Sequence, residues 1–136
     1  MGLRILISMF LYFSLIVNAF AQSNADQEAI EDKNLARFDQ VIELLQNKNL
    51  TEKEQASLLY EKATLMFATF GPLYLRTATE SLLEAIKISP DKKEYKKYLA
   101  EAYDYFWKSK DLSGSDKISI DLTKLRNQIK ETLNIK

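Results

Sequence analysis

The sequence contains no cysteine and no histidine. Without them the chain lacks the usual ligand sets for zinc, haem and iron–sulfur clusters, and it cannot build a Ser-His or Cys-His catalytic arrangement. The lack of cysteine also excludes disulfide bonds, so the hydrophobic core must hold the fold together. We therefore expect a protein without metal sites, cofactors or catalytic residues.

Glycine and proline are scarce, with three glycines and two prolines among 136 residues. Because these residues are the strongest turn formers, their scarcity favours long elements joined by short connections. Apolar residues recur at helical spacing, and no segment shows the alternation of a half-buried strand. The sequence predicts an all-α fold, in which short connections place neighbouring helices antiparallel.

Neither sign of charge dominates, because 19 Lys and Arg residues balance 19 Asp and Glu residues. Nucleic-acid-binding domains usually carry a marked basic excess. The one locally basic tract, residues 92–97, is better explained as the solvated start of a helix. We expect no nucleic-acid partner.

An apolar run at residues 5–17 follows a single positive charge, Arg4. Ala19 and Ala21 stand where a signal peptidase requires small residues, which favours cleavage after Ala21. The apolar stretch up to that point has 17 residues, fewer than the roughly 20 of a spanning helix. The sequence predicts a cleavable signal peptide over residues 1–21.

Cleavage would leave 115 of the 136 residues, with 18 basic and 19 acidic side chains. The mature chain would begin at Gln22, whereas a bacterial lipoprotein needs a cysteine there. We expect a soluble exported protein, not a lipoprotein, without stable membrane insertion after cleavage. Its location would be the periplasm in a Gram-negative host and the exterior otherwise.

A polar lead-in at residues 22–26 precedes one predicted domain at residues 27–136. Thr51 with Glu54 and Asp91 with Glu94 have the spacing of capping boxes, and Asp116 is placed to start a last helix. Gly71-Pro72 predicts a helix break. About five helices are expected, over residues 27–46, 51–70, 73–88, 91–108 and from 116 onward.

Seven positions between residues 78 and 103 stand at offsets that resemble a tetratricopeptide repeat, a helix–turn–helix unit of about 34 residues. Small residues at three of them would let helix backbones approach closely. The resemblance implies antiparallel helical hairpins stacked as a short right-handed array. The seven positions are Ala78, Leu82, Ala85, Pro90, Leu99, Ala100 and Tyr103.

The resemblance also implies a concave groove, lined by the first helix of each repeat, that binds a protein or peptide segment. An alternative surface is the aromatic stripe of Tyr98 and Tyr105, seven residues apart, which could instead pack against the last helix. The predicted groove residues are Tyr60, Thr64, Phe67, Lys97, Glu101 and Asp104.

These features favour a non-enzymatic, exported interaction module or adaptor whose partner is another protein. The exposed ends of a short array also allow self-association as a homo-oligomer. Paired carboxylates such as Glu52 and Glu54 leave a hydrolase as a third hypothesis, although most stand beside Lys or Arg on polar faces. The main alternative is a carrier for a lipid or other small apolar ligand, lined by Met66, Phe67, Phe70 and Tyr74.

Overall fold

The computed structural model describes residues 24–136, and the predicted signal peptide at residues 1–21 lies outside them. The described chain is helical and contains no strand. Within it, none of the helices has the length and hydropathy needed to cross a bilayer. The elements are α2 (Asn24–Leu45), α3 (Glu52–Phe70), the 3₁₀ turn η1 (Gly71–Tyr74), α4 (Leu75–Ile88), α5 (Lys93–Ala102), the π-helical turn η2 (Tyr103–Trp107) and α6 (Lys117–Leu133).

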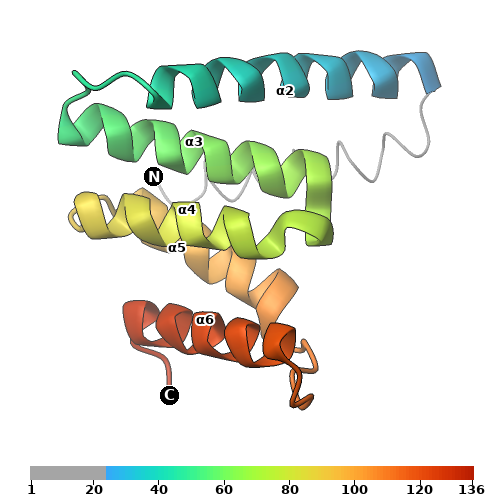
Figure 1. Cartoon of the computed structure of the whole chain (residues 1–136), viewed down its shortest axis with the longest axis vertical. Helices are drawn as coiled ribbons and strands as arrows, with labels where there is room; N and C mark the ends of the chain where they lie inside the picture. The colour runs from blue at the N-terminus through green and yellow to red at the C-terminus, as the bar shows by residue number, and fades with distance from the viewer. Residues whose placement is uncertain (1–23) are drawn as a thin grey trace.

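Each of the five predicted ranges therefore contains an α-helix. In Figure 1, α2, α3 and α4 lie one below another, α5 crosses behind α4, and α6 lies beside α4 and α5 at the carboxyl-terminal end. The α3–α4 hairpin is the most extensively packed pair of helices. One hydrophobic cluster runs from α3 through α4 and α5 to α6.

Helix α2 starts earlier than predicted, because Asn24–Asp26 of the expected polar lead-in are already helical. Asp26 stands in the first turn, where a negative charge interacts favourably with the helix dipole. An ion pair joins the helix to α3: Arg37 Nε and Nη2 donate to the two oxygens of Glu61 at 2.6 and 2.9 Å. Val41 of α2 is fully buried.

The predicted capping box at the start of α3 is confirmed. The backbone N–H of Glu54 donates to Thr51 Oγ1 at 3.1 Å, and the N–H of Thr51 donates to Glu54 Oε2 at 2.9 Å. Two backbone donors that the helix itself leaves unpaired are thereby satisfied. The predicted core face of α3, with Ala56, Leu59 and Ala63, is buried.

The predicted break at Gly71-Pro72 is also present. Gly71 has a φ of 54°, which a residue without a Cβ adopts readily, and Pro72 lies in the 3₁₀ turn that follows. The turn delays α4 to Leu75, two residues after the predicted start. It reverses the chain so that Ala63 of α3 and Ala78 of α4 are both buried in the hairpin.

The predicted capping box at Asp91 is wrong. The backbone N–H of Lys92 donates to the carbonyl of Ser89 at 3.2 Å, so residues 89–92 form a turn and Asp91 is exposed within it. Lys92 becomes the residue before the helix, and it makes no side-chain cap. With Lys92 in the N-cap position, Glu94 is the second helical residue, whereas a capping box needs the acidic side chain at the third.

The fourth predicted helix changes its winding after Ala102. The N–H of Lys108 donates to the carbonyl of Tyr103 at 2.9 Å, which closes a π-helical turn. The wider turn directs Trp107 inward, where its Nε1 donates to Thr79 Oγ1 of α4 at 3.2 Å. This buried hydrogen bond ties η2 to α4.

Asp116 begins α6 as predicted, since its carboxylate accepts a hydrogen bond from the N–H of Ser119 at 3.3 Å. Leu125 and Ile129 of the predicted apolar stripe are buried. Ile118 is not part of the core, however, because it is 70% exposed. The first turn of α6 projects beyond the helices that bury the later turns.

Candidate functional site

Helices α3 and α5 meet along a row of aromatic side chains, which we call the α3–α5 seam. The Tyr60 ring of α3 stacks on Tyr95 of α5, with ring centroids 4.6 Å apart. It meets Tyr98 edge-on at 5.5 Å. Such ring pairs stabilise a contact beyond the area they bury. Tyr60 is a predicted groove residue, whereas its two aromatic neighbours on α5, Tyr95 and Tyr98, were not predicted to line the groove.

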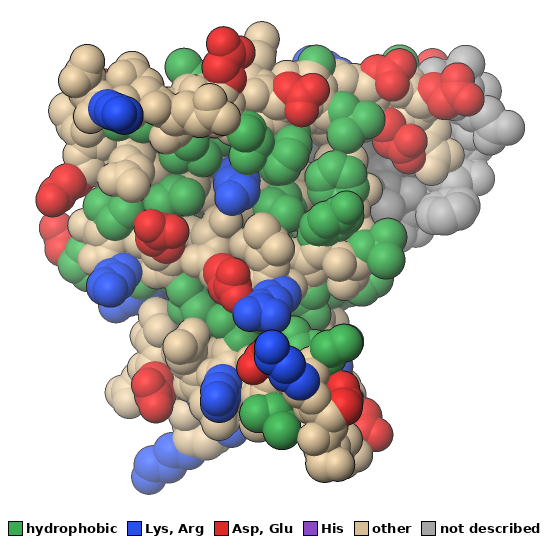
Figure 2. All heavy atoms as spheres, viewed as in Figure 1, with side chains coloured by type: hydrophobic (Ala, Val, Ile, Leu, Met, Phe, Trp, Pro, Cys, Tyr) green, Lys and Arg blue, Asp and Glu red, His purple; other side chains and the backbone are tan. Residues whose placement is uncertain are grey.

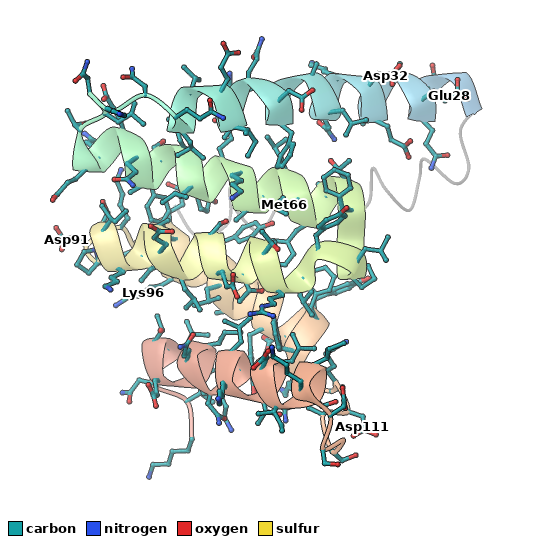
Figure 3. All side chains as sticks on the ribbon, in the orientation of Figure 1. Glu28, Asp32, Met66, Asp91, Lys96 and Asp111 are labelled. Carbon is teal, nitrogen blue, oxygen red and sulfur yellow. The ribbon has the colours of Figure 1, made fainter. Side chains whose placement is uncertain are left out.

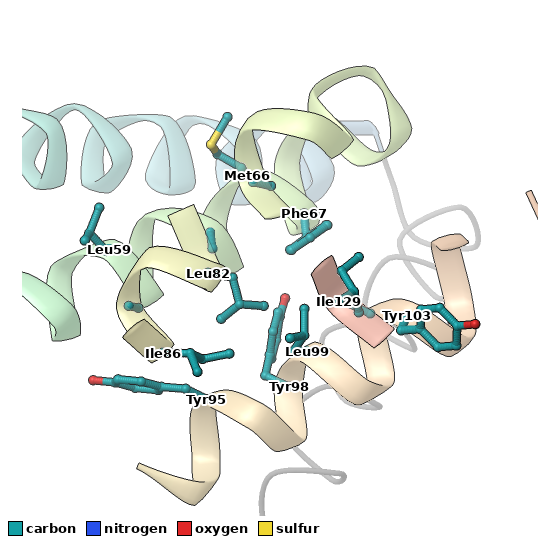
Figure 4. Packing of buried hydrophobic residues seen from close by; sticks show 14 of the residues in the cluster. Leu59, Met66, Phe67, Leu82, Ile86, Tyr95, Tyr98, Leu99, Tyr103 and Ile129 are labelled. Atoms are coloured by element: carbon teal, nitrogen blue, oxygen red, sulfur yellow. The ribbon is translucent and has the colours of Figure 1, made fainter. Parts of the chain in front are cut away.

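Phe67 continues the seam toward η2. Its ring lies 5.9 Å from Tyr98 and stacks on Phe106 at 5.2 Å. Figure 4 shows the Tyr98 ring directed from α5 toward Phe67. Phe67 is only 5% exposed, so it forms the floor of the seam and offers almost no surface to a partner.

The predicted aromatic stripe of Tyr98 and Tyr105 does not form a common surface. Tyr98 is 6% exposed and packs against α3, whereas Tyr105 is 63% exposed. The π-helical turn between them breaks the spacing that would align residues seven apart on a regular helix. Tyr105 contacts the neighbouring Phe106 ring edge-on at 4.7 Å.

The polar groove residues come from both sides of the seam, and we call them its rim: Thr64 lies on α3, Lys97 and Glu101 on α5, and Asp104 in η2. Thr64 is half-buried, and its hydroxyl donates to the carbonyl of Glu61 at 2.8 Å. Lys97 and Glu101 are half-buried on α5, one turn apart, and Asp104 is exposed in η2. Five of the six predicted groove residues thus keep some exposed surface, and Phe67 does not.

The carboxylate of Glu101 has an unusual environment. Both of its oxygens are buried, and neither has a hydrogen-bond partner in the part of the chain that the structure describes. Burial raises the pKa of Glu101, and the positive charge of Lys97 lowers it to a smaller extent. Sequence patterns gave no sign of this environment.

The tyrosine hydroxyls of the seam are also perturbed. Burial raises the pKa of Tyr60, and the negative charges of Glu94 and Glu101 raise it further. Burial raises the pKa of Tyr95 as well, while a hydrogen bond with Ser57 opposes the shift. Both hydroxyls therefore stay protonated at neutral pH.

The residues suggested for an apolar carrier pocket mostly fill space. Met66 and Phe67 belong to the core. The Phe70 ring meets Phe38 edge-on at 5.8 Å and lies 4.8 Å from Tyr74. Met66 lies among the packed side chains in Figure 4. These contacts occupy the space that a ligand would need.

A separate depression that the sequence did not predict lies where α4, α5 and α6 meet. Its volume is about 980 Å³, with Ile86 and Pro90 among its apolar lining residues and Lys87, Lys96 and Glu131 among its charged ones. Figure 2 shows charges of both signs interspersed on this side of the molecule. Its lining comes from separate helices, so no local sequence pattern could indicate it.

The carboxylates considered for catalysis are dispersed or engaged. Glu54 completes the capping box, and Glu61 pairs with Arg37. Glu28 and Asp32 lie on α2, near its amino-terminal end (Figure 3). Among residues 24–136 no three acidic side chains gather in a way that could hold a metal ion.

Comparisons with protein-family models, with curated proteins and with solved structures find no match to this chain.

Proposed function

We propose that this protein is an exported, non-enzymatic interaction module whose α3–α5 seam binds a segment of another protein. The observation that carries the proposal is the stacking of Tyr60 on Tyr95 and its edge-on contact with Tyr98. This cluster holds a half-buried tyrosine in a fixed position between two helices. Rigid aromatic side chains with a polar tip are the residues most often found at protein-binding hot spots.

A tetratricopeptide-like architecture fits this role. Ala63, Ala78 and Ala85 are all buried, as the close helix packing of such a unit requires. In this arrangement α3 and α5 are the first helices of two successive hairpins, and α2 and α6 cover the ends. A groove between first helices is open to an extended or helical segment.

Export is part of the proposal because of residues 1–21. A single positive charge, an apolar run and small residues before Gln22 are together typical of a cleavable signal peptide. The partner would then be a protein of the periplasm or of the extracellular space.

The test is to use residues 22–136 as bait in an extract of exported proteins. The variant Tyr60→Ala removes the central aromatic side chain of the seam, and we expect it to lose a protein that the unaltered bait retains. Circular dichroism must show that the variant remains helical. Amino-terminal sequencing of the secreted product checks for cleavage after Ala21.

The matched control is Tyr105→Ala, which removes an exposed aromatic side chain outside the seam. It should retain the partner. Equal capture by all three baits, or no specific capture by any of them, would contradict the proposed function.

A further inference from the structure

The rim of the α3–α5 seam is acidic. Glu94, Lys97, Glu101 and Asp104 follow one another at spacings of three and four residues along α5 and η2. Three of these side chains are acids and one is a base. On a regular helix, residues at these spacings share a face, so Glu94, Lys97 and Glu101 lie on one face of α5, and Asp104 follows in the π-helical turn. A segment that docks on this rim meets net negative charge, which favours a basic partner.

Within the rim, Glu101 has unused hydrogen-bonding capacity. Neither carboxylate oxygen accepts a hydrogen bond from the described residues, although both are buried. The residue as a whole keeps some exposed surface. A buried carboxylate without hydrogen bonds is costly, and a donor from a partner would remove that cost.

The Glu101 carboxylate interacts electrostatically with one tyrosine of the seam. The charge of Glu101 contributes to the raised pKa of Tyr60, which places the Tyr60 hydroxyl within its electrostatic reach. The Tyr60 ring is in turn in contact with Tyr98. Aromatic faces attract cations, and the attraction increases where water is excluded.

An arginine side chain matches this combination better than other cations. A planar guanidinium presents two parallel N–H groups to two carboxylate oxygens, stacks on aromatic rings and gives up its hydration more readily than an ammonium. A metal ion is a poor match, because the described residues offer no cluster of acidic ligands here.

We infer that the α3–α5 seam contains a guanidinium site formed by Glu101 and Tyr60, and that an arginine of the partner protein occupies it. This inference rests on the proposed function, since it names the chemistry by which the seam recognises its partner. Docking of the arginine turns the carboxylate toward the seam opening, where both of its oxygens accept hydrogen bonds.

The experiment selects a displayed library of random short peptides on the purified protein. We expect the retained peptides to share an arginine at one position. Citrulline has nearly the shape of arginine but carries no charge. Replacing the shared arginine of the best synthetic peptide by citrulline should weaken binding by at least about thirtyfold, the effect expected for loss of one buried charge pair.

Two protein variants locate the site. Glu101→Gln should reduce the affinity for the arginine peptide to the level of the citrulline peptide on the unaltered protein. Glu84→Gln removes an exposed carboxylate of α4 and should leave the affinity unchanged. Circular dichroism establishes that both variants fold.

The outcomes separate the two claims. Peptides that bind the seam without a shared arginine, or that bind Glu101→Gln as tightly as the unaltered protein, would overturn the guanidinium site and leave the interaction module standing. Retention of no peptide at all would contradict the proposed function and the guanidinium site with it.

Discussion

The Nε1 of Trp107 donates a hydrogen bond to Thr79 Oγ1 at 3.2 Å, and both residues are completely buried. One comes from the π-helical turn after α5 and the other from α4. The bond satisfies a polar group on the largest fully buried side chain of the protein. It also connects the α5 segment to the α3–α4 hairpin, on which the position of the seam depends.

We expect Thr79→Val to lower the free energy of unfolding by about 1–3 kcal/mol, because it leaves the indole N–H buried without an acceptor. Trp107 is the only tryptophan in the chain, so its fluorescence during urea denaturation measures the effect directly. Thr77→Val makes the same chemical change at an exposed position of α4 and is the control. Equal midpoints for the two variants would show that the bond contributes nothing.

The capping box of α3 gives a second prediction. Thr51→Ala removes the acceptor for the N–H of Glu54 and should destabilise the protein by about 1 kcal/mol. Asp91→Ala should change stability by only a few tenths of a kcal/mol, because Asp91 lies in the turn before α5 and caps nothing. Urea denaturation of both variants checks the contrast, and a larger loss for Asp91→Ala would refute it.

The close approach of α3 and α4 gives a third prediction. Ala63 is fully buried, and a longer side chain there would push the helices apart. We expect Ala63→Leu to cost about 1–3 kcal/mol, measured as a fall in the free energy of unfolding. Ala29→Leu, on the exposed face of α2, is the matched control. A stabilising effect of Ala63→Leu would show that the hairpin has room and would weaken the tetratricopeptide-like interpretation.

Local signals in the sequence predicted local structure well. Thr51 and Glu54 form their capping box within one helical turn. Gly71 ends α3 with a positive φ, which glycine adopts without help from distant residues. Asp91 has the same spacing to Glu94, yet it lies within the turn at residues 89–92 and does not cap α5. The position of that turn depends on where α4 ends and on how α5 packs, and a four-residue motif carries no information about either.

The candidate site was predicted less completely, for a related reason. The repeat resemblance assigned Phe67 to the groove surface, but the side chain is only 5% exposed. The π-helical turn brings Phe106 onto the Phe67 ring and turns Tyr105 away. The unpartnered state of the Glu101 carboxylate likewise follows from packing between helices, so only the folded structure reveals it.

Glu101 also gives stability a specific dependence on pH. Burial raises its pKa in the folded protein above the ordinary value of 4.5, with Lys97 opposing the shift. The folded state therefore holds the proton more tightly than the unfolded state does. Below pH 4.5 the group is protonated in both states and contributes full stability. As the pH rises through the folded-state pKa, that contribution is lost, since the buried carboxylate must ionise.

We expect Glu101→Gln to remove this loss, because an amide does not ionise. The difference in free energy of unfolding between the variant and the unaltered protein should shift in favour of the variant between about pH 4 and neutral pH. Urea denaturation across this range measures the difference, and Glu84→Gln gives the baseline for removing an exposed carboxylate. Glu94 and Lys97 are unchanged in all three proteins, so their charges contribute equally to each free energy of unfolding. A difference for Glu101→Gln that stays constant with pH would mean that Glu101 ionises equally easily in both states, and its carboxylate would then be exposed to water in solution.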